Sequence, residues 1–404
     1  MDRENIIIIA SVIFIFAVVM FSPKAHETEE TRFIKIGVLT FSKDSNASDA
    51  FLATQAIDDI NQYCLNQSIP YQFKPVFKCN EHRAQKAIEL VDEFHIENVS
   101  IIVGFRWGGE LDACDYQSKG YGMVIVSPYA STSFHRDIYP HIIQLMPIDI
   151  HETQVIARAM VELGYMETVI FTENYNMHPG YMVDEFRMYY EEMGGVVKDT
   201  VAYGFSQNLA QINETLSRLE DAVYPNTAIF YPETRPYTQY FYEIHNHPSL
   251  LNYTWFSTSS AKSNYTAELT ATPGLDEIKL IHPNLVKTPD YSNPVYNELN
   301  SLYIAEFGEN MSRYTGNIYD AVWLSALTII ETGEYNNLTF IETFPEVARD
   351  YTGASGNCSL DQYGDRLNAC YNIYEYILRG EDIYLKEIGY CDTSKPEIEW
   401  TELQ

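Results

Sequence analysis

Short apolar runs alternate with amphipathic stretches through the first part of the chain. Residues 33–39, 71–77 and 99–104 have the length and composition of buried strands. Between them, residues 50–61 and 82–94 carry apolar side chains at helical spacing. Strict alternation of strand and helix predicts a parallel sheet with helices on both faces, joined by right-handed crossovers. The predicted fold class is therefore α/β.

The same alternation begins again after residue 149, which indicates a second lobe similar to the first. The pattern predicts helices over 151–163, 181–193, 209–222 and 237–247, and strands over 168–171, 196–203, 227–231 and 253–256. The late section is less regular. It predicts a strand over 275–281, helices over 294–306 and 318–330, a turn-rich segment over 353–366 and a strand over 371–378.

Two neighbouring strands of the first series open into loops that suit a small ligand. Residues 105–110 follow the strand 99–104, and residues 127–132 follow the apolar run 123–126. Both loops leave the carboxyl ends of parallel strands, where open α/β sheets bind ligands with backbone N–H groups, hydroxyls and helix N-termini. The alternative is that they are ordinary connections, which every such sheet contains.

The charge balance excludes one class of partner. The chain has 404 residues, enough for two lobes, and Asp plus Glu number 56 against 26 Lys plus Arg. With that balance no continuous basic surface can form, so nucleic acid is not an expected partner. The acidity itself is also what solubility in salty water requires.

The N-terminus carries the one strongly hydrophobic stretch. Residues 6–21 contain no charged side chain and approach the length that spans a bilayer. No small-x-small cleavage site follows them, so we expect a retained signal anchor over residues 1–22, with a cleaved signal peptide as the alternative. Residues 23–32 are polar and acidic and are expected to form a short tether.

Sequons and cysteines favour an exported body, on the extracellular face of the cell membrane behind a single-pass N-terminal anchor. Chance pairing of Asn with Ser or Thr would give about three Asn-x-Ser/Thr sequons. The chain has them at Asn46, Asn66, Asn98, Asn213, Asn252, Asn264, Asn310, Asn337 and Asn357. Six cysteines without a CxxC spacing favour disulfides over a metal site. We therefore expect a glycoprotein without a bound metal.

Catalytic motifs are missing from the chain. We find no P-loop, nucleophile elbow or HExxH, and no Cys/His pair in the context of a nucleophile. His245 and His247 are two residues apart, so they do not share a helix face. The expectation is a protein that is not an enzyme and has no cofactor.

With these motifs in place, the chain resembles the type I periplasmic binding proteins, in particular the branched-chain amino-acid (leucine/isoleucine/valine) binding group, over nearly all of residues 33–390. Each motif alone is weak, but their order and spacing are fairly specific. They are Ile36-Gly37-Val38 with the following residues 56–61, Ile102-Val103-Gly104 followed by Val126-Ser127-Pro128, the residues 318–321, and residues 356–366, similar to the family's Gly-x-Leu-x-Phe-Asp-x-x-Gly-Asp.

The resemblance implies two Rossmann-like lobes joined by a hinge of three strands, with crossings near Pro147, Ile281 and Cys358. The first lobe would comprise residues 33–147 and 282–357, and the second residues 148–281 and 358–404. Ligand would lie in the cleft, and hinge closure around it would be the working motion.

Cysteine pairing follows from that implied arrangement. A disulfide between Cys79 and Cys114 is expected, because both would lie at one edge of the first lobe, where family members often have a bridge. Cys358 and Cys370 bracket the turn-rich segment and are the expected second pair. Cys64 and Cys391 stay unassigned.

The ligand contacts implied by the resemblance fall on five loops. In the first lobe they are Trp107, Gly108, Gly109, Tyr129, Ala130, Ser131 and Thr132, and across the cleft they are Glu173, Tyr175, Glu233, Thr234 and Ser259. Two departures put an α-amino-acid ligand in question. Gly108 stands where amino-acid binders usually have a hydroxyl, and residues 257–260 contain no acid to pair with a ligand ammonium.

The expected function is capture of a small polar ligand, an amino acid, amide or related molecule, by a monomer that delivers it to the membrane permease of an ABC-type transporter. One alternative is a ligand-sensing ectodomain, although no signalling module follows in this sequence. Another is a surface protein that has lost its ligand, which the sequons would suit.

Overall fold

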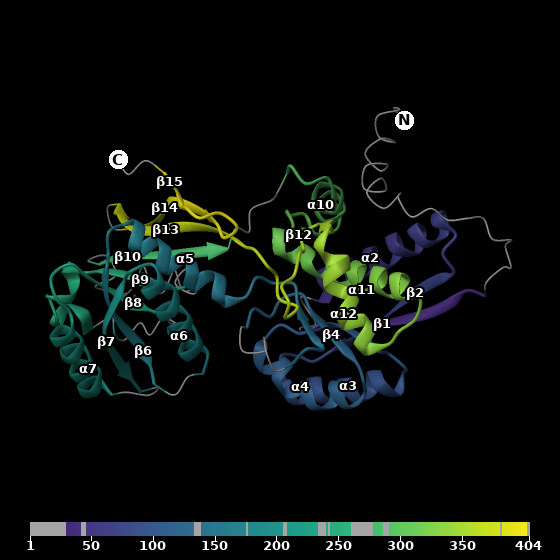
Figure 1. Cartoon of the computed structure of the whole chain (residues 1–404), viewed down its shortest axis with the longest axis horizontal. Coiled ribbons are helices and arrows are strands. Elements are labelled where there is room, and N and C mark those ends of the chain that lie inside the picture. The colour runs from purple at the N-terminus through teal and green to yellow at the C-terminus, as the bar shows by residue number, and fades with distance from the viewer. Residues whose placement is uncertain are drawn as a thin grey trace.

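Two sheets form the framework of the protein in the computed structural model (Figure 1). The structure describes residues 30–41, 46–132, 139–174, 177–204, 208–232, 240, 243–259, 278–285, 291–379 and 382–401. The parallel strands and flanking helices confirm the predicted α/β class.

The first sheet has five parallel strands in the order β2-β1-β3-β4-β5. They are β1 (Arg32–Thr40), β2 (Tyr71–Cys79), β3 (Ile101–Gly104), β4 (Val124–Ser127) and β5 (Ile142–Gln144). Its short central strands β3 and β4 are buried at every position, as their continuous apolar runs predict. β5 was not among the predicted strands.

Helices from two distant parts of the chain cover the first sheet. One face packs against α2 (Asn46–Gln67), α10 (Pro294–Phe307), α11 (Asn317–Thr332) and α12 (Asn337–Arg349). The other packs against α3 (Ala84–Ile96) and α4 (Gly108–Gly120). Figure 1 shows α11 and α12, coloured green, beside the purple α2 and β1. The core on this face of the sheet is therefore complete only when helices beyond residue 290 pack against it.

The second sheet has the order β15-β14-β13-β10-β9-β8-β6-β7. Its parallel part contains β6 (Glu167–Glu173), β7 (Val196–Tyr203), β8 (Thr227–Tyr231), β9 (Thr254–Ser257) and β10 (Lys279–Leu285). Its antiparallel part contains β13 (Cys370–Arg379), β14 (Asp382–Asp392) and β15 (Glu399–Trp400). Helices α5 (Asp149–Glu162) and α6 (Met177–Glu192) cover one face, and α7 (Leu209–Ala222) covers the other.

The chain passes from one sheet to the other after β5 and again after β10. The third passage leads from a small hairpin, formed by β11 (Thr352–Gly353) and β12 (Gly356–Asn357), to β13. The first and third of these passages lie side by side. The Gln144 N–H donates to the Gly364 carbonyl at 3.0 Å, and Gln144 Nε2 donates to Asp365 Oδ1 at 2.8 Å.

Several local expectations differ from the structure. The strand predicted over 275–281 is β10, so residues 282–285, expected in the first lobe, pair within the second sheet. The described end of the helix predicted over 237–247 is a 3₁₀ turn, Ile244–Asn246. Helix α12 and strands β14 and β15 were not predicted.

All six cysteines are free thiols, so the predicted disulfides Cys79–Cys114 and Cys358–Cys370 are wrong for this structure. Cys114 is buried in the apolar cluster under α3 and α4, whereas Cys79 is half-buried at the end of β2. Cys358 is buried in the core of the first sheet, while Cys370 begins β13 of the second. A pair that brackets a turn in sequence is thus divided between two sheets.

Within the described ranges, which begin at residue 30, no helix is both long and apolar enough to cross a membrane. The anchor predicted over residues 1–22 lies outside them, as does most of the tether.

Candidate functional site

The loops after β3 and β4 touch each other at the carboxyl edge of the first sheet. Trp107 is 55% exposed and precedes α4, which begins at Gly108. A Cβ atom added at Gly108 would lie 2.8 Å from Thr132 Cγ2, too close for any real side chain. Gly108 stands where amino-acid binders usually have a hydroxyl. Its lack of a side chain is therefore what allows the two loops to come into contact.

A buried carboxylate that the sequence did not single out holds the first loop. Glu110 is buried, and its Oε2 accepts the N–H groups of Arg106 at 3.0 Å and Trp107 at 3.3 Å. Its Oε1 accepts a hydrogen bond from Asn80 Nδ2 at 2.7 Å. A Glu three residues after the helix cap is a capping-box signal that could have identified it.

The second loop is held by two side chains, Ser127 at the end of β4 and Gln144 at the end of β5. The Ala130 N–H donates to Ser127 Oγ at 3.1 Å, and Ser127 Oγ donates to the Phe105 carbonyl at 3.2 Å. At its far end the Thr132 carbonyl accepts Gln144 Nε2 at 2.9 Å. Both loops are therefore fixed to each other and to β5 before any ligand arrives.

Tyr129 connects this loop to the start of α2. Its hydroxyl donates to Asp49 Oδ1 at 2.6 Å, and its ring lies edge-on to Phe41, 6.2 Å between centroids. The guanidinium of Arg106 lies 4.3 Å above the Phe41 ring. Burial raises the pKa of Asp49 to about 6, against the lowering effects of the Tyr129 hydrogen bond and of the Arg106 charge.

Helix α5, which packs on the second sheet, contacts the second ligand loop. The Asp149 N–H donates to the Ser131 carbonyl at 2.8 Å, which joins the start of this helix to the second loop. One turn later, the buried Glu152 accepts hydrogen bonds from the Ser259 N–H and from Ser259 Oγ, the latter at 3.3 Å. Ser259 follows β9, so a carboxylate from α5 stands at a loop that has none of its own between residues 257 and 259.

The remaining predicted contacts are less closely defined. Glu173 is buried at the carboxyl end of β6, and Gly109 is exposed on α4. Tyr175, Glu233 and Thr234 lie outside the described residues. The structure therefore brings together the first-lobe contacts, and across from them Ser259 with Glu152. Among the residues it describes, no group of His, Cys, Asp and Glu could hold a metal ion.

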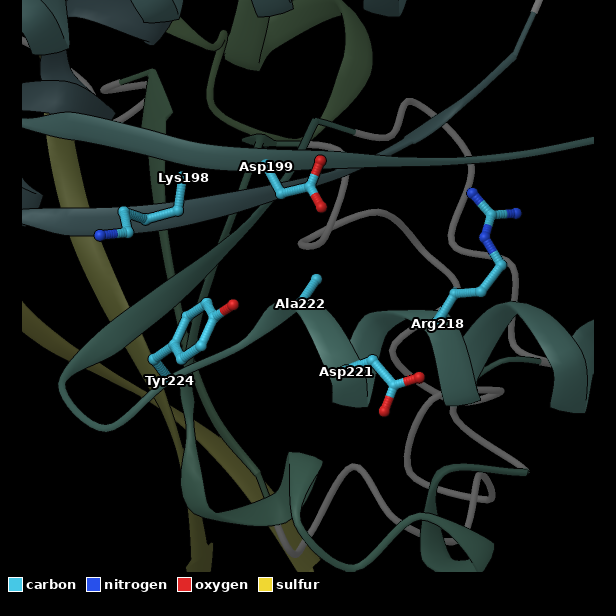
Figure 2. A pocket seen from close by; sticks show the side chains of 6 residues that line it. All are labelled: Lys198, Asp199, Arg218, Asp221, Ala222 and Tyr224. Carbon is cyan, nitrogen blue, oxygen red and sulfur yellow. The ribbon is translucent and has the colours of Figure 1, made fainter.

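A hollow of about 330 Å³ lies elsewhere, between β7 and α7 (Figure 2). The side chains lining it are those of Lys198, Asp199, Arg218, Asp221, Ala222 and Tyr224, and all but Ala222 are exposed. Lys198 pairs with Glu167 at 3.1 Å rather than with a group in the hollow. We regard the loop edge as the candidate site, because its polar groups are buried and converge.

Comparison with known proteins agrees with this architecture. The sequence profile of the Receptor family ligand binding region matches residues 52–378. No curated protein sequence matches the chain at a significant level.

Solved structures of solute-binding proteins are similar in fold. An ABC transporter substrate-binding protein from Desulfitobacterium hafniense has 16% identity and a TM-score of 0.64, over 88% of this chain and 100% of that one. LivJ from Streptococcus pneumoniae, in complex with isoleucine, has 16% identity and a TM-score of 0.59 over the same shares. A solute-binding protein from R. palustris, in complex with 4-hydroxybenzoate, has 17% identity and a TM-score of 0.62, over 89% of this chain and 97% of that one.

These identities establish the fold, and the profile establishes the family. The family and the structural neighbours are ligand-binding proteins without enzymatic activity, so the prediction that the chain is not an enzyme is confirmed. The chain belongs to the receptor family ligand-binding region and has the fold of the type I periplasmic binding proteins.

Proposed function

We propose that this protein captures a small polar ligand between two lobes and passes it to an ABC-type transporter. The observation that carries the proposal is the convergence of two ligand loops at the Gly108–Thr132 contact, joined to α5 by the Asp149–Ser131 hydrogen bond. The α4 helix begins in the first of these loops, and the partial positive charge of its N-terminus favours an anionic group such as a ligand carboxylate.

The proposed lobes follow the two sheets. The first lobe takes residues 33–147 and the stretch from the second passage to residue 357, and the second lobe takes the rest of the body with β10 included. The contacts proposed on the first lobe are Trp107, Gly108, Gly109, Tyr129, Ala130, Ser131 and Thr132. Those proposed on the second are Glu173, Tyr175, Glu233, Thr234 and Ser259, with Glu152 added behind Ser259. Closure would be a hinge motion at the three passages.

The proposed setting is the extracellular face of the cell membrane, with residues 1–22 as anchor, sequons carrying sugar and a membrane permease as partner. Relatives in fold are named as substrate-binding proteins of ABC transporters, which supports the uptake role. A second candidate is a ligand-sensing ectodomain, which the receptor description of the matching family favours.

Thermal unfolding of the full chain against leucine, isoleucine, 4-hydroxybenzoate, acetamide and urea tests the capture function. A ligand at a hundred times its dissociation constant adds about 2.7 kcal/mol, which we expect to raise the melting temperature by about 2–4 °C. No shift with any of these compounds would count against capture of a small polar ligand. A permease that co-purifies with this protein from source membranes would favour the uptake role. A signalling protein that co-purifies with it would favour the sensing role.

A further inference from the structure

Asp49 lies at the same sheet edge as the ligand loops. It belongs to the first turn of α2, which follows the carboxyl end of β1. Its neighbours come from the loops of the candidate site: Tyr129 after β4 donates to its Oδ1, and the Arg106 charge after β3 acts on it. The carboxylate is therefore buried beside the two ligand loops rather than exposed on the surface of the helix.

One oxygen of this carboxylate has no hydrogen-bond donor among the residues that the structure describes. Asp49 is 4% exposed, and Oδ2 is buried and unpaired. Buried carboxylate oxygens are normally supplied with donors, because losing water is costly for a charged group. Asp320 shows the usual case: it is completely buried, and its two oxygens accept from the Ala354 N–H, the Ser355 N–H and Ser355 Oγ.

A second buried acceptor lies at the other end of the same loop. Gln144 Nε2 donates to both the Thr132 carbonyl and Asp365 Oδ1, which fixes the orientation of its amide. Within the described part of the chain, its Oε1 has no donor. Across the site, by contrast, Glu152 already accepts from Ser259. Of these acceptors, those in need of a donor, Asp49 and Gln144, are thus on the first-lobe side.

We propose that Asp49 Oδ2 receives the protonated amine of the ligand. This inference rests on the proposed capture function and narrows its substrate class to molecules that carry an ammonium group. Tyr129 orients the carboxylate, and the α2 N-terminus stabilises its charge. With a ligand carboxylate at the α4 N-terminus, Asp49 provides the negative charge that the loop of residues 257–259 lacks, and both charges of an amino acid find partners on the first lobe.

Three probes of nearly the same shape isolate the ammonium: leucine, 4-methylpentanoate, which lacks the amine, and 3-methylbutylamine, which lacks the carboxylate. Their affinities for the full chain are measured by calorimetry. We expect the wild type to bind leucine about tenfold or more tightly than 4-methylpentanoate. Asp49→Asn should remove that preference while changing the affinity for 4-methylpentanoate by less than about twofold.

Asp59→Asn is the matched control, because Asp59 lies on the same helix and also accepts a tyrosine hydroxyl, from Tyr319 at 2.8 Å. It should leave all three affinities unchanged. Equal losses for leucine and 4-methylpentanoate in Asp49→Asn would overturn the inference, since a packing role weakens both. A wild type that binds 4-methylpentanoate or 4-hydroxybenzoate but not the amines would overturn it while the capture function stands. A wild type that binds none of them would overturn both.

Discussion

Gly108 and Thr132 stand so close that the two ligand loops leave no room for a side chain on the glycine; an added Cβ would be 2.8 Å from Thr132 Cγ2 and 2.9 Å from Thr132 Cβ. The next residue, Gly109, has open space around the same position. The two glycines therefore have different roles, although they are adjacent in one helix turn.

Gly108→Ala is expected to lower the free energy of unfolding by about 1–3 kcal/mol, because the loops must move apart. It should also weaken ligand binding. Gly109→Ala is the control and should raise stability by about 0.5–1 kcal/mol through helix propensity. Urea unfolding of both variants measures the difference, and equal effects would contradict the contact.

Arg366 holds the third passage to the first lobe from a buried position. Its guanidinium donates to the Leu145 carbonyl, Asn317 Oδ1 and Ser355 Oγ, each at 3.0 Å. We expect Arg366→Met to cost about 3–5 kcal/mol, because several buried acceptors lose their donor. Arg349→Met, at an exposed position on α12, should change stability by less than about 0.5 kcal/mol. Similar unfolding midpoints for the two variants would show that the buried network is dispensable.

Stability should depend on pH through Asp49, whose pKa burial raises from 3.8 to about 6. The folded protein then holds this proton more tightly than the unfolded chain does. The contribution to stability is fully present below pH 3.8 and is lost as pH rises through 6. Asp49→Asn should therefore gain stability over wild type as the pH rises from about 3.8 to about 6, by up to about 3 kcal/mol. A constant difference across that range would contradict the raised pKa.

The thiols give a direct test of the cysteine state. Cys79 and Cys370 are half-buried and the other four are buried, where burial raises the pKa of Cys64 and Cys391 to about 11 and of Cys114 and Cys358 to about 12. Alkylation of the folded protein without reductant should modify Cys79 and Cys370, and alkylation after unfolding should modify all six. A mass that falls short by two alkyl groups after unfolding would indicate a disulfide.

Glu152 should control the mobility of the loop after β9. Glu152→Gln keeps the shape of the side chain but removes the charge that the Ser259 N–H and hydroxyl bind. We expect faster amide exchange at Ser259, since hydrogen bonds to a charged acceptor contribute about 1.5–3 kcal/mol. Glu162→Gln, at the other end of α5 beside Trp400, should leave that exchange unchanged. Exchange that is identical in the two variants would argue against a link through Glu152.

Sequence periodicity was sufficient for most of the framework. The runs that became β3 and β4 are apolar at every position, and α11 is strongly apolar along its length, so each was predictable without tertiary information. Helix α12 was missed because Pro345 lies inside it, which normally argues against a helix. The helix predicted to begin at residue 50 begins at Asn46, so Ser48 lies inside α2, where its hydroxyl contacts that of Tyr303 at 3.1 Å.

The site was predictable only where a residue directly follows a strand. Trp107 and Thr132 could be predicted in that way, whereas Asp49 and Glu152 lie on helices and reach the site through contacts with Tyr129 and Ser259. Such contacts join residues 80 and 107 positions apart, which no local pattern encodes. The predicted Cys358–Cys370 disulfide failed for the same reason, since the two cysteines belong to different sheets.

The covering of the first sheet by α10, α11 and α12 fixes when the protein can finish folding during synthesis. Its apolar face, including Ile36, Val38 and Ile101, packs against residues such as Ile318 and Phe340. A nascent chain that has reached the end of β9 therefore still exposes this face to solvent, and contacts so distant in sequence form slowly. The second sheet likewise waits for β13 and β14. Neither lobe can complete its core before α12 has been synthesised, and the second must also wait for β14. We therefore expect a ribosome-bound intermediate with an open apolar surface, of the kind that chaperones bind.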